Sequence, residues 1–454
     1  MTNILSAGHV HCLGIGGIGV SGLARLLHWR GIIVTGSDLR QSIVTDDMQK
    51  LGVKVWIGPH DSSHVPPDAK IIVHTVATSQ DNVELAEARR RGLTVITYPE
   101  AVGQLTEGKR LITVSGTHGK TTTTAMIGQL LIAAGLDPTV LVGSRLASID
   151  GNARNGQGDY FVLEGDEYGR AFLNYHPEIA VITNIESDHL DVYRDIDDIK
   201  ETFVQFLTNI KPNGTLVFNH DDANVLDLAK HFKGHAVSFG LSGGNYLGLI
   251  QGQERGAIFN EAHTGTIRLA IPGSFNVSNA LAAISVGQLL GIKPDLIVKT
   301  LGEFAGLWRR FEIVGEHNGA IIISDYAHHP TAVRATVAAA RQYFPDRHLL
   351  VAFQPHHRHR TKALFNDFVD ALSGIDKLIL QEIYDVAGRE TDSTQDVSSR
   401  QLLDVLRQHG NDGIYCANDA DTEATLKGVI KPNDVVLIMG AGTIDTVARN
   451  LVKQ

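Results

Sequence analysis

The chain has 454 residues, of which 43% are hydrophobic and 20% are charged, and its formal net charge is −10. This length is too great for one ordinary hydrophobic core and predicts about two to four domains. The acidic balance argues against a nucleic-acid-binding protein, which usually carries a basic stripe. Cys12 and Cys416 lie far apart in apolar runs, which argues against a disulfide framework and a cysteine-based zinc site.

The first residues predict a strand and not a targeting segment. No basic region precedes the short apolar run at residues 9–13, which leads directly into a glycine-rich turn. No window along the chain approaches the ~20 continuous apolar residues that a membrane span requires. We therefore expect a soluble cytoplasmic protein, either a monomer or a weak homodimer.

Short β-rich runs alternate with longer helical patterns along nearly the whole chain, which predicts parallel α/β layers. The first block contains a glycine turn followed by a helix that ends near Arg30, and we expect its boundary near residue 107. Its predicted strands lie at residues 9–13, 32–37, 54–57, 71–75 and 93–97.

The second block opens with a strand at residues 110–115 that feeds another glycine turn and then a long helix. Between residues 235 and 272, glycine-punctuated segments predict antiparallel hairpins at the edge of this domain. The other predicted elements are strands at residues 160–163, 179–184 and 215–219, a helix at 276–290 and a helix that ends near 304.

The third block begins near residue 312 and again alternates strands with helices. Its predicted strands lie at residues 320–325, 348–353, 377–381 and 435–439. The sequence shows no low-complexity linker and no internal repeat. It therefore predicts an α/β chain of three domains, at residues 1–107, 108–312 and 313–454.

The clearest motif is SGTHGKTT at residues 115–122, between an apolar strand and a helix. Glycines allow backbone amides to turn toward phosphate oxygens, and a helix N-terminus adds partial positive charge. Lys120 is expected to reach the β- and γ-phosphates of a nucleotide, and Thr121 to hold Mg²⁺. Val114 stands where the common form of this loop has its first glycine. An ordinary glycine turn is the alternative, but the order of strand, loop and helix favours a nucleoside triphosphate.

A second glycine motif, G-x-G-x-x-G, lies at residues 14–19, after a strand and before a helix. Ser37 and Asp38 end the following strand, close to the acidic position of dinucleotide-binding folds. Alone, the motif could indicate NAD and a redox protein, or a glycine turn that only packs a helix on a strand. Hydride transfer needs no ATP, however, and a nucleotide loop follows later in the chain. We therefore expect a nucleotide-linked substrate here, held by Gly14, Gly16, Gly17, Gly19, Ser37 and Asp38.

Two polar clusters follow apolar strands of the second block. Glu164 lies in the segment EGDE after one strand, and His189 lies in NIESDHLD after another. Ligands of open α/β sheets bind beyond the carboxyl ends of the strands, and hard oxygen ligands suit Mg²⁺. Solvated loops with helix caps are the alternative, since Asp188 and Asp191 are plausible caps. We favour metal binding by Glu164 and His189.

Seven motifs, taken as a set, resemble the Mur ligase family in order and spacing. They are GTHGKTTT, EGDE, NIESDHLD, GSFNVSNALAA, RRFE, DYAHHPT and QPHHRHRT, and they cover essentially the whole chain. The resemblance implies a Rossmann-like domain for a UDP-sugar, a central P-loop ATPase domain and a Rossmann-like domain for an amino acid. In the central domain it implies a mostly parallel sheet with a small antiparallel part. It also implies an ATP- and Mg²⁺-dependent ligase of peptidoglycan precursor synthesis.

Two groups within the family compete. The G-x-G-x-x-G start, DYAHHPT and QPHHRHRT resemble the members that add L-alanine to UDP-N-acetylmuramate. The muropeptide-recycling members add a whole tripeptide to the same sugar, and they typically have an EPRSNTMK-like segment where this chain has QPHHRHRT, at residues 354–361. The match favours alanine as the acceptor, with tripeptide addition as the alternative.

The resemblance also assigns roles to individual residues, position by position. It implies catalytic roles for Lys120, Glu164, His189 and His328, and metal binding by Thr121, Glu164 and His189. It implies amino-acid binding by His356, Arg360 and Tyr384. Phe275 departs from the family's usual histidine, and His357 stands where the alanine-adding group often has arginine. The residues implied to bind ATP are Gly116, Thr117, His118, Gly119, Lys120, Thr121, Thr122, Asn276, Asn279, Arg310 and Asp325.

The histidines of the third block also have simpler interpretations. His328 or His329 could cap the helix that is expected from Pro330. The HHRHR run at residues 356–360 could be a solvated basic edge. The run directly follows an apolar strand, and a position at the carboxyl end of a strand favours a binding site.

Overall fold

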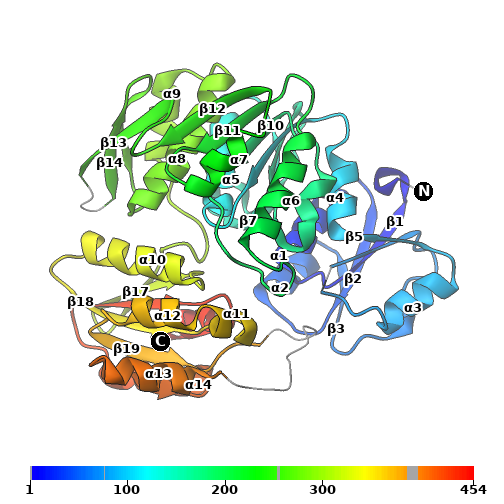
Figure 1. The fold of residues 1–454 in the computed structure, drawn as a ribbon. Coiled ribbons are helices and arrows are strands. Elements are labelled where there is room, and N and C mark those ends of the chain that lie inside the picture. Colours follow the sequence, from blue (N-terminus) through cyan, green and yellow to red (C-terminus); the bar gives the residue numbers. More distant parts are fainter. Residues whose placement is uncertain (1–2, 76, 253–255, 386–396, 454) are drawn as a thin grey trace. The chain divides into compact units, whose positions relative to one another are not determined.

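The computed structural model describes residues 3–75, 77–252, 256–385 and 397–453 (Figure 1). It is a mixed α/β structure with three sheets. Among the described residues, no helix is long and apolar enough to cross a membrane. The chain divides into two compact units. Unit 1 comprises Met1–Ile185, Lys200–Phe239 and Ala282–Leu296, and unit 2 comprises Glu186–Ile199, Gly240–Leu281 and Ile297–Gln454.

The first sheet of unit 1 is parallel throughout, with the strand order β3-β2-β1-β4-β5. This order is that of a Rossmann-like sheet. From β1 the chain adds strands first on one side and then, from β4, on the other, so the strand order reverses between β1 and β4. The strands, drawn in blue in Figure 1, are β1 (His9–Leu13), β2 (Ile33–Asp38), β3 (Lys54–Ile57), β4 (Ile71–His74) and β5 (Thr94–Thr97). The helices between them are α1 (Ile18–Trp29), α2 (Ile43–Lys50) and α3 (Val83–Arg90), and α4 (Tyr98–Thr106) follows β5.

The second sheet has, within unit 1, the strand order β12-β11-β10-β6-β9-β7-β8. Neighbouring strands from β12 to β7 run parallel to each other, and β8 runs antiparallel to β7. The strands are β6 (Arg110–Ser115), β7 (Thr139–Leu146), β8 (Gly151–Arg154), β9 (Tyr160–Glu164), β10 (Ile179–Ile182), β11 (Thr215–Asn219) and β12 (His235–Gly240). The helices are α5 (Lys120–Ala133), α6 (Ile196–Thr208) and α7 (Ala223–Ala229).

The structure corrects one prediction for this sheet. The hairpin region was expected to begin near residue 235, but β12 pairs in parallel with β11. Helix α7 lies between the two strands and returns the chain to the same end of the sheet, which makes the pairing parallel. The predicted antiparallel part is confirmed further along, in unit 2. It comprises β13 (Tyr246–Gly252), β14 (Ala257–Glu261) and β15 (Gly265–Leu269), and the helices α8 (Ser274–Leu289) and α9 (Pro294–Gly302) follow.

The third sheet, in unit 2, has the strand order β16-β17-β21-β18-β19-β20. Only the pairing of β16 with β17 is antiparallel. The strands are β16 (Glu312–His317), β17 (Ala320–Asp325), β18 (His348–Phe353), β19 (Lys377–Gln381), β20 (Ile414–Cys416) and β21 (Asp434–Met439). The helices are α10 (Pro330–Tyr343), α11 (Arg358–Ala363), α12 (Phe365–Leu372), α13 (Ser399–Gln408), α14 (Asp419–Val429) and α15 (Asp445–Val452).

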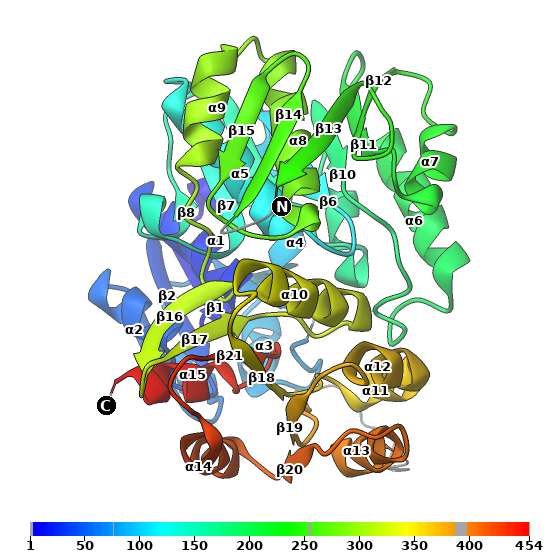
Figure 2. The same cartoon turned by 90° about the vertical axis from the view of Figure 1, so that its left-hand side faces the viewer.

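Helices cover both faces of this sheet (Figure 2). Successive strand side chains point to opposite faces. Ile323 and Leu437 therefore join a core with residues of α10, α12 and α13. Ile322 and Val436 join a second core with residues of α14 and α15. The long apolar strands of the third block are thus explained by burial on both faces.

Short 3-10 helices complete the described structure, at Ile4–Ser6, Ser62–His64, Ala147–Ile149 and Tyr168–Asn174. Several predicted strands have the observed bounds, including those at residues 9–13, 54–57 and 110–115. The strands β7, β8, β16 and β20 were not predicted. Both cysteines are buried and unpaired, as expected.

Candidate active site

The loop between β6 and α5 has the backbone geometry that a phosphate loop requires. Gly116 and Gly119 have positive φ angles of 131° and 81°, which a glycine adopts without steric strain. The Thr117 amide donates to the carbonyl oxygen of Asn184 at 3.0 Å, and the His118 amide donates to its side-chain oxygen at 2.7 Å. The segment after β10 therefore holds in place the loop that is predicted to bind ATP.

Replacing Gly116 with alanine is expected to disrupt this loop. The new Cβ would collide with Thr183 Oγ1 and lie 2.8 Å from the Asn184 carbonyl oxygen. Strain of about 1–3 kcal/mol would lower nucleotide affinity roughly tenfold or more. Titration with a fluorescent ATP analogue measures the effect. Gly135→Ala is a matched control, because Gly135 also has a positive φ but its Cβ would meet nothing within 4 Å; equal affinities for the two variants would contradict the prediction.

Lys120, the first residue of α5, is held by an acidic side chain of the same unit. Its ammonium donates to the two carboxylate oxygens of Glu167 at 2.9 and 2.8 Å and to the Gly116 carbonyl at 2.6 Å. Burial alone would lower the pKa of Lys120, but the charges of Glu167 and Asp166 raise it above its usual value. The lysine therefore stays charged, as a phosphate-binding lysine must.

Two of the predicted metal ligands lie together. The Thr121 hydroxyl donates to Glu164 Oε1 at 2.9 Å, and the Gly143 amide donates to Glu164 Oε2 at 2.6 Å. The two side chains meet because Thr121 lies just after β6, at the start of α5, and Glu164 is the last residue of the neighbouring parallel strand β9. A hydroxyl and a carboxylate at the start of a phosphate loop are oxygen donors that suit Mg²⁺. His189, the third predicted ligand, lies in unit 2, and its role in metal binding stays a prediction.

The glycine turn after β1 is joined to the end of β2. The Gly14 amide donates to the Ser37 carbonyl at 2.8 Å, and the Gly16 amide donates to Asp38 Oδ2 at 2.8 Å. A Cβ on Gly16 would lie 2.7 Å from that carboxylate, and one on Gly19 would lie 2.9 Å from the Tyr98 ring. The residues predicted to bind the sugar nucleotide therefore lie together, and the Asp38 carboxylate stabilises the glycine turn by accepting the Gly16 amide hydrogen bond.

Glu84, which no sequence pattern indicated, has a buried carboxylate next to Ser37. It accepts hydrogen bonds at 2.9 Å from the Ser37 hydroxyl, 2.8 Å from His11 and 2.6 Å from His60. Burial alone would raise the pKa of Glu84, but the hydrogen bonds from His11 and His60 outweigh it and lower the pKa to about 2. No local motif indicates this role, because an acidic residue in the first turn of a helix is common.

Glu84 is expected to make the protein acid-sensitive. Because its folded-state pKa of about 2 lies below the ordinary 4.5, the unfolded chain takes up the proton first as the pH falls. The stabilisation is therefore complete above about pH 4.5 and is lost toward pH 2, with a magnitude on the order of 3 kcal/mol. Urea unfolding followed by tryptophan fluorescence measures it. Glu84→Gln should show a smaller loss over this range, and an equal loss in both proteins would contradict the assignment.

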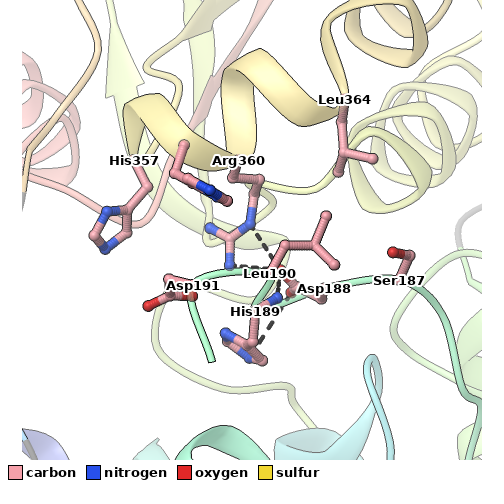
Figure 3. A pocket seen from close by; sticks show the side chains of 9 residues that line it. Ser187, Asp188, His189, Leu190, Asp191, His357, Arg360 and Leu364 are labelled. Atoms are coloured by element: carbon pink, nitrogen blue, oxygen red, sulfur yellow. Dashed lines mark hydrogen bonds and ion pairs between the residues drawn. The ribbon is translucent and has the colours of Figure 1, made fainter. Parts of the chain in front are cut away.

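Unit 2 contains a pocket lined by residues that follow β10 and by residues of α11 (Figure 3). In it, Arg360 points to Asp188, and its Nε and Nη2 each lie 2.8 Å from Asp188 Oδ1. Burial would raise the pKa of Asp188, but His189 and Arg360 hold it well below its usual range. Asp188 is therefore an ion-pair partner and not a helix cap, and the run after β18 is not a solvated basic edge.

The residues predicted to bind the amino acid lie together beside this ion pair. The rings of His356 and Tyr384 stack with centroids 5.7 Å apart, and His328 meets His356 edge-on at 5.8 Å. Arg360 Nη1 lies 3.4 Å from His356 Nδ1. These side chains follow the carboxyl ends of β17, β18 and β19 in the same sheet, where ligands of open α/β sheets bind.

The two adjacent histidines before α10 differ in role. His329 is the N-cap of α10 and accepts a hydrogen bond from the Thr331 amide at 3.3 Å, so the simpler interpretation holds for it. His328 Nδ1 lies 2.7 Å from the Tyr326 carbonyl oxygen, which makes Nδ1 the protonated nitrogen. Burial, Arg360 and His356 all lower the pKa of His328 well below its usual value. A neutral imidazole with this tautomer can accept a proton at Nε2.

The remaining predicted ATP residues of unit 2 form two pairs. Asn279 Nδ2 lies 3.2 Å from Asn276 Oδ1, and both side chains are buried. Asp325 accepts hydrogen bonds from the Phe311 and Ala327 amides, each at 2.7 Å. Burial raises the pKa of Asp325, while the charge of the nearby Arg310 opposes the rise. The structure thus places Arg310 near Asp325, and the predicted contact of both with ATP stays a prediction.

Family models match nearly the whole chain. The Mur ligase family catalytic domain matches residues 9–110, the Mur ligase middle domain matches 114–287, and the glutamate ligase domain of Mur ligases matches 309–442. The chain belongs to the Mur ligase family. This membership agrees with the phosphate loop and removes the redox alternative for the first glycine motif.

Full-length Mur ligase relatives support the finer assignment. The chain is 39% identical to UDP-N-acetylmuramate–L-alanine ligase of Desulfosudis oleivorans, with 97% of each chain covered. It is 41% identical to the enzyme of that name from Clostridium tetani, with 96% of each covered. Among solved structures, UDP-N-acetylmuramate–alanine ligase of Thermotoga maritima matches with a TM-score of 0.83 at 28% identity over 98% of both chains. The murein peptide ligase of Psychrobacter arcticus shares the fold, with a TM-score of 0.76 at 23% identity over 98% of both chains.

Proposed function

We propose that the chain is an ATP-dependent ligase that joins L-alanine to the lactyl carboxylate of UDP-N-acetylmuramate. The observation that carries the proposal is the likeness of about 40% identity over nearly the full length to ligases of that name. The phosphate loop with its charged Lys120 supports the use of ATP. We propose that the enzyme acts in the cytoplasm, in peptidoglycan precursor synthesis.

The first step forms an acyl phosphate. A carboxylate is a poor acyl donor, because it has no good leaving group. In the proposed step a lactyl carboxylate oxygen attacks the γ-phosphorus of ATP, the bond to the β,γ-bridging oxygen breaks, and ADP leaves. Lys120 and the loop amides neutralise charge on the transferred group, which is the main requirement of phosphoryl transfer.

Mg²⁺ is proposed to bind at the start of this loop. Thr121 and Glu164 would hold it, with His189 as a further ligand. When bound, the ion neutralises phosphate charge.

The second step forms the amide bond. The neutral amino group of L-alanine attacks the acyl carbon, a tetrahedral intermediate forms, and inorganic phosphate leaves. We propose that His328 accepts the proton released by the amine, because its burial keeps it neutral. The planar guanidinium of Arg360 is suited to the carboxylate of alanine, with His356 and Tyr384 beside it.

The proposal is tested by phosphate release from ATP and Mg²⁺ with UDP-N-acetylmuramate, comparing four acceptors. L-alanine is expected to support release, while glycine and L-serine should be weaker by about 1–3 kcal/mol in kcat/KM. Release must depend on both the sugar nucleotide and the acceptor. Release with the recycling tripeptide alone would assign the chain to the tripeptide-adding group, and no release with any acceptor would reject the ligase function.

A further inference from the structure

The buried carboxylate of Glu84 connects four separate segments of the first sheet. Glu84 lies in the first turn of α3 and is fully buried. Its oxygens accept from His11 in β1, from Ser37 in β2, and from His60 and His64 in the segment after β3, with His64 at 3.3 Å. One side chain therefore fixes the relative positions of the elements around the turn at residues 14–19.

A purely structural role does not explain this choice of residue. A buried charge is costly, and a hydrophobic residue of similar volume often stabilises a core as well or better. A carboxylate does, however, fix the direction and the tautomer of each imidazole that donates to it. His60 points Nδ1 to Glu84, and its side chain is 21% exposed. The network therefore extends from a fully buried anion to a half-buried imidazole at the surface.

The network also reaches the glycine turn. Ser37 donates its hydroxyl to Glu84, and its carbonyl accepts from the amides of Gly14 and Ile15 at 2.8 and 3.2 Å. These amides open the turn at the carboxyl end of β1, next to the point where the strand order reverses between β1 and β4. Ligands of such sheets bind at this point.

We propose that Glu84 is a positioning residue of the sugar-nucleotide site. Through Ser37 it fixes the glycine turn, and through His60 it presents an oriented imidazole nitrogen, so that the uridine diphosphate part of the substrate meets a preformed site. The inference rests on the proposed function only in its choice of ligand. A preformed site raises affinity, because binding then does not carry the entropic cost of ordering the side chains and the turn.

The test is direct binding of UDP to the full chain by calorimetry, without ATP or alanine. Glu84→Gln keeps the volume and removes the charge. We expect UDP affinity to fall roughly tenfold, because the glycine turn and the His60 imidazole are then no longer held in the binding geometry. In turnover, the KM of this variant for the sugar nucleotide should rise by the same factor. Its KM values for ATP and L-alanine should stay within about twofold of those of the unchanged chain. A general loss of structure would move all three KM values.

A double-mutant cycle and a matched control complete the design. His60→Gln should weaken UDP binding by itself. Glu84→Gln should then weaken UDP binding less in the His60→Gln variant than it does in the unchanged chain. If Glu84→Gln does not fold, Ser37→Ala replaces it in the cycle. Asp68→Asn removes the carboxylate that pairs with His9 at 3.0 Å, at the opposite end of β1, and should leave UDP affinity unchanged.

The outcomes separate this inference from the proposed function. If the unchanged chain binds UDP but makes no amide, the ligase function fails and the cycle still decides the role of Glu84. If folded Glu84→Gln binds UDP within about twofold of the unchanged chain, or if its effect adds fully to that of His60→Gln, the inference is overturned. It is also overturned if the unchanged chain does not bind UDP.

Discussion

Replacing Lys120 with alanine is expected to abolish ATP-dependent ligation, with a fall in kcat of roughly 10²–10³-fold or more. The Lys120 ammonium lies against the phosphate loop, 2.6 Å from the Gly116 carbonyl oxygen. Without it, the loop amides remain, but the chain loses the side-chain charge that would neutralise the transferred phosphoryl group. Phosphate release with saturating ATP, sugar nucleotide and L-alanine measures the loss.

The Lys120 variant needs a control for folding, because it leaves the buried Glu167 without its ion-pair partner. Removing one member of a buried pair costs about 3–5 kcal/mol of stability. Adding Glu167→Gln should restore the melting temperature but not the activity. Lys109→Ala is the matched control, because the Lys109 ammonium donates to the Gly158 carbonyl at the other end of β6, away from the phosphate loop. Full activity of folded Lys120→Ala would reject the proposed mechanism.

Arg360→Lys is expected to weaken the use of L-alanine selectively. The substitution keeps a positive charge beside Asp188 but loses the planar fork that can bind two carboxylates at once. A lost charged hydrogen bond of about 2 kcal/mol corresponds to roughly a thirtyfold fall in kcat/KM for L-alanine. The KM for ATP should remain nearly constant. Steady-state kinetics with each substrate varied in turn measures both.

Arg358→Lys is the matched control for this prediction. Arg358 lies in the same short helix, but it pairs with Asp385 at 2.8 Å and donates to the Val397 carbonyl. The Arg358→Lys substitution should leave the KM for L-alanine unchanged. Equal effects of the two substitutions would show that α11 is merely sensitive to change and that Arg360 does not bind the acceptor.

Much of the fold could be predicted because the information is local. Apolar runs flanked by glycine turns located β1, β3 and β6 with their observed ends, and the repeated alternation with helices predicted parallel sheets. The phosphate loop was predictable for the same reason, since strand, glycines, Lys120 and helix are contiguous. The error at β12 arose where glycines suggested a hairpin, because the direction of pairing depends on the path taken by α7.

The pairings inside the sites depend on contacts that no local pattern encodes. Lys120 and Glu167 are 47 residues apart, and Asp188 and Arg360 are 172 apart. Lys120 begins the helix after β6, and Glu167 follows the neighbouring strand β9. Asp188 follows β10, and Arg360 lies in α11, beside it in the folded unit. The sequence identified Lys120 and Arg360 as candidates, but their acidic partners looked like metal ligands or caps.

The sequence by itself determined the family, the alternation of strands and helices, and the residue types at the phosphate loop. These follow from periodicity, glycine and proline positions, and contiguous motifs. Only the tertiary structure decided that His329 caps a helix while His328 is buried neutral, and that Glu84 joins β1, β2 and the segment after β3. The physical reason is that a side chain's charge and hydrogen bonds depend on its burial and on neighbours from distant segments, which are set when the strands pair.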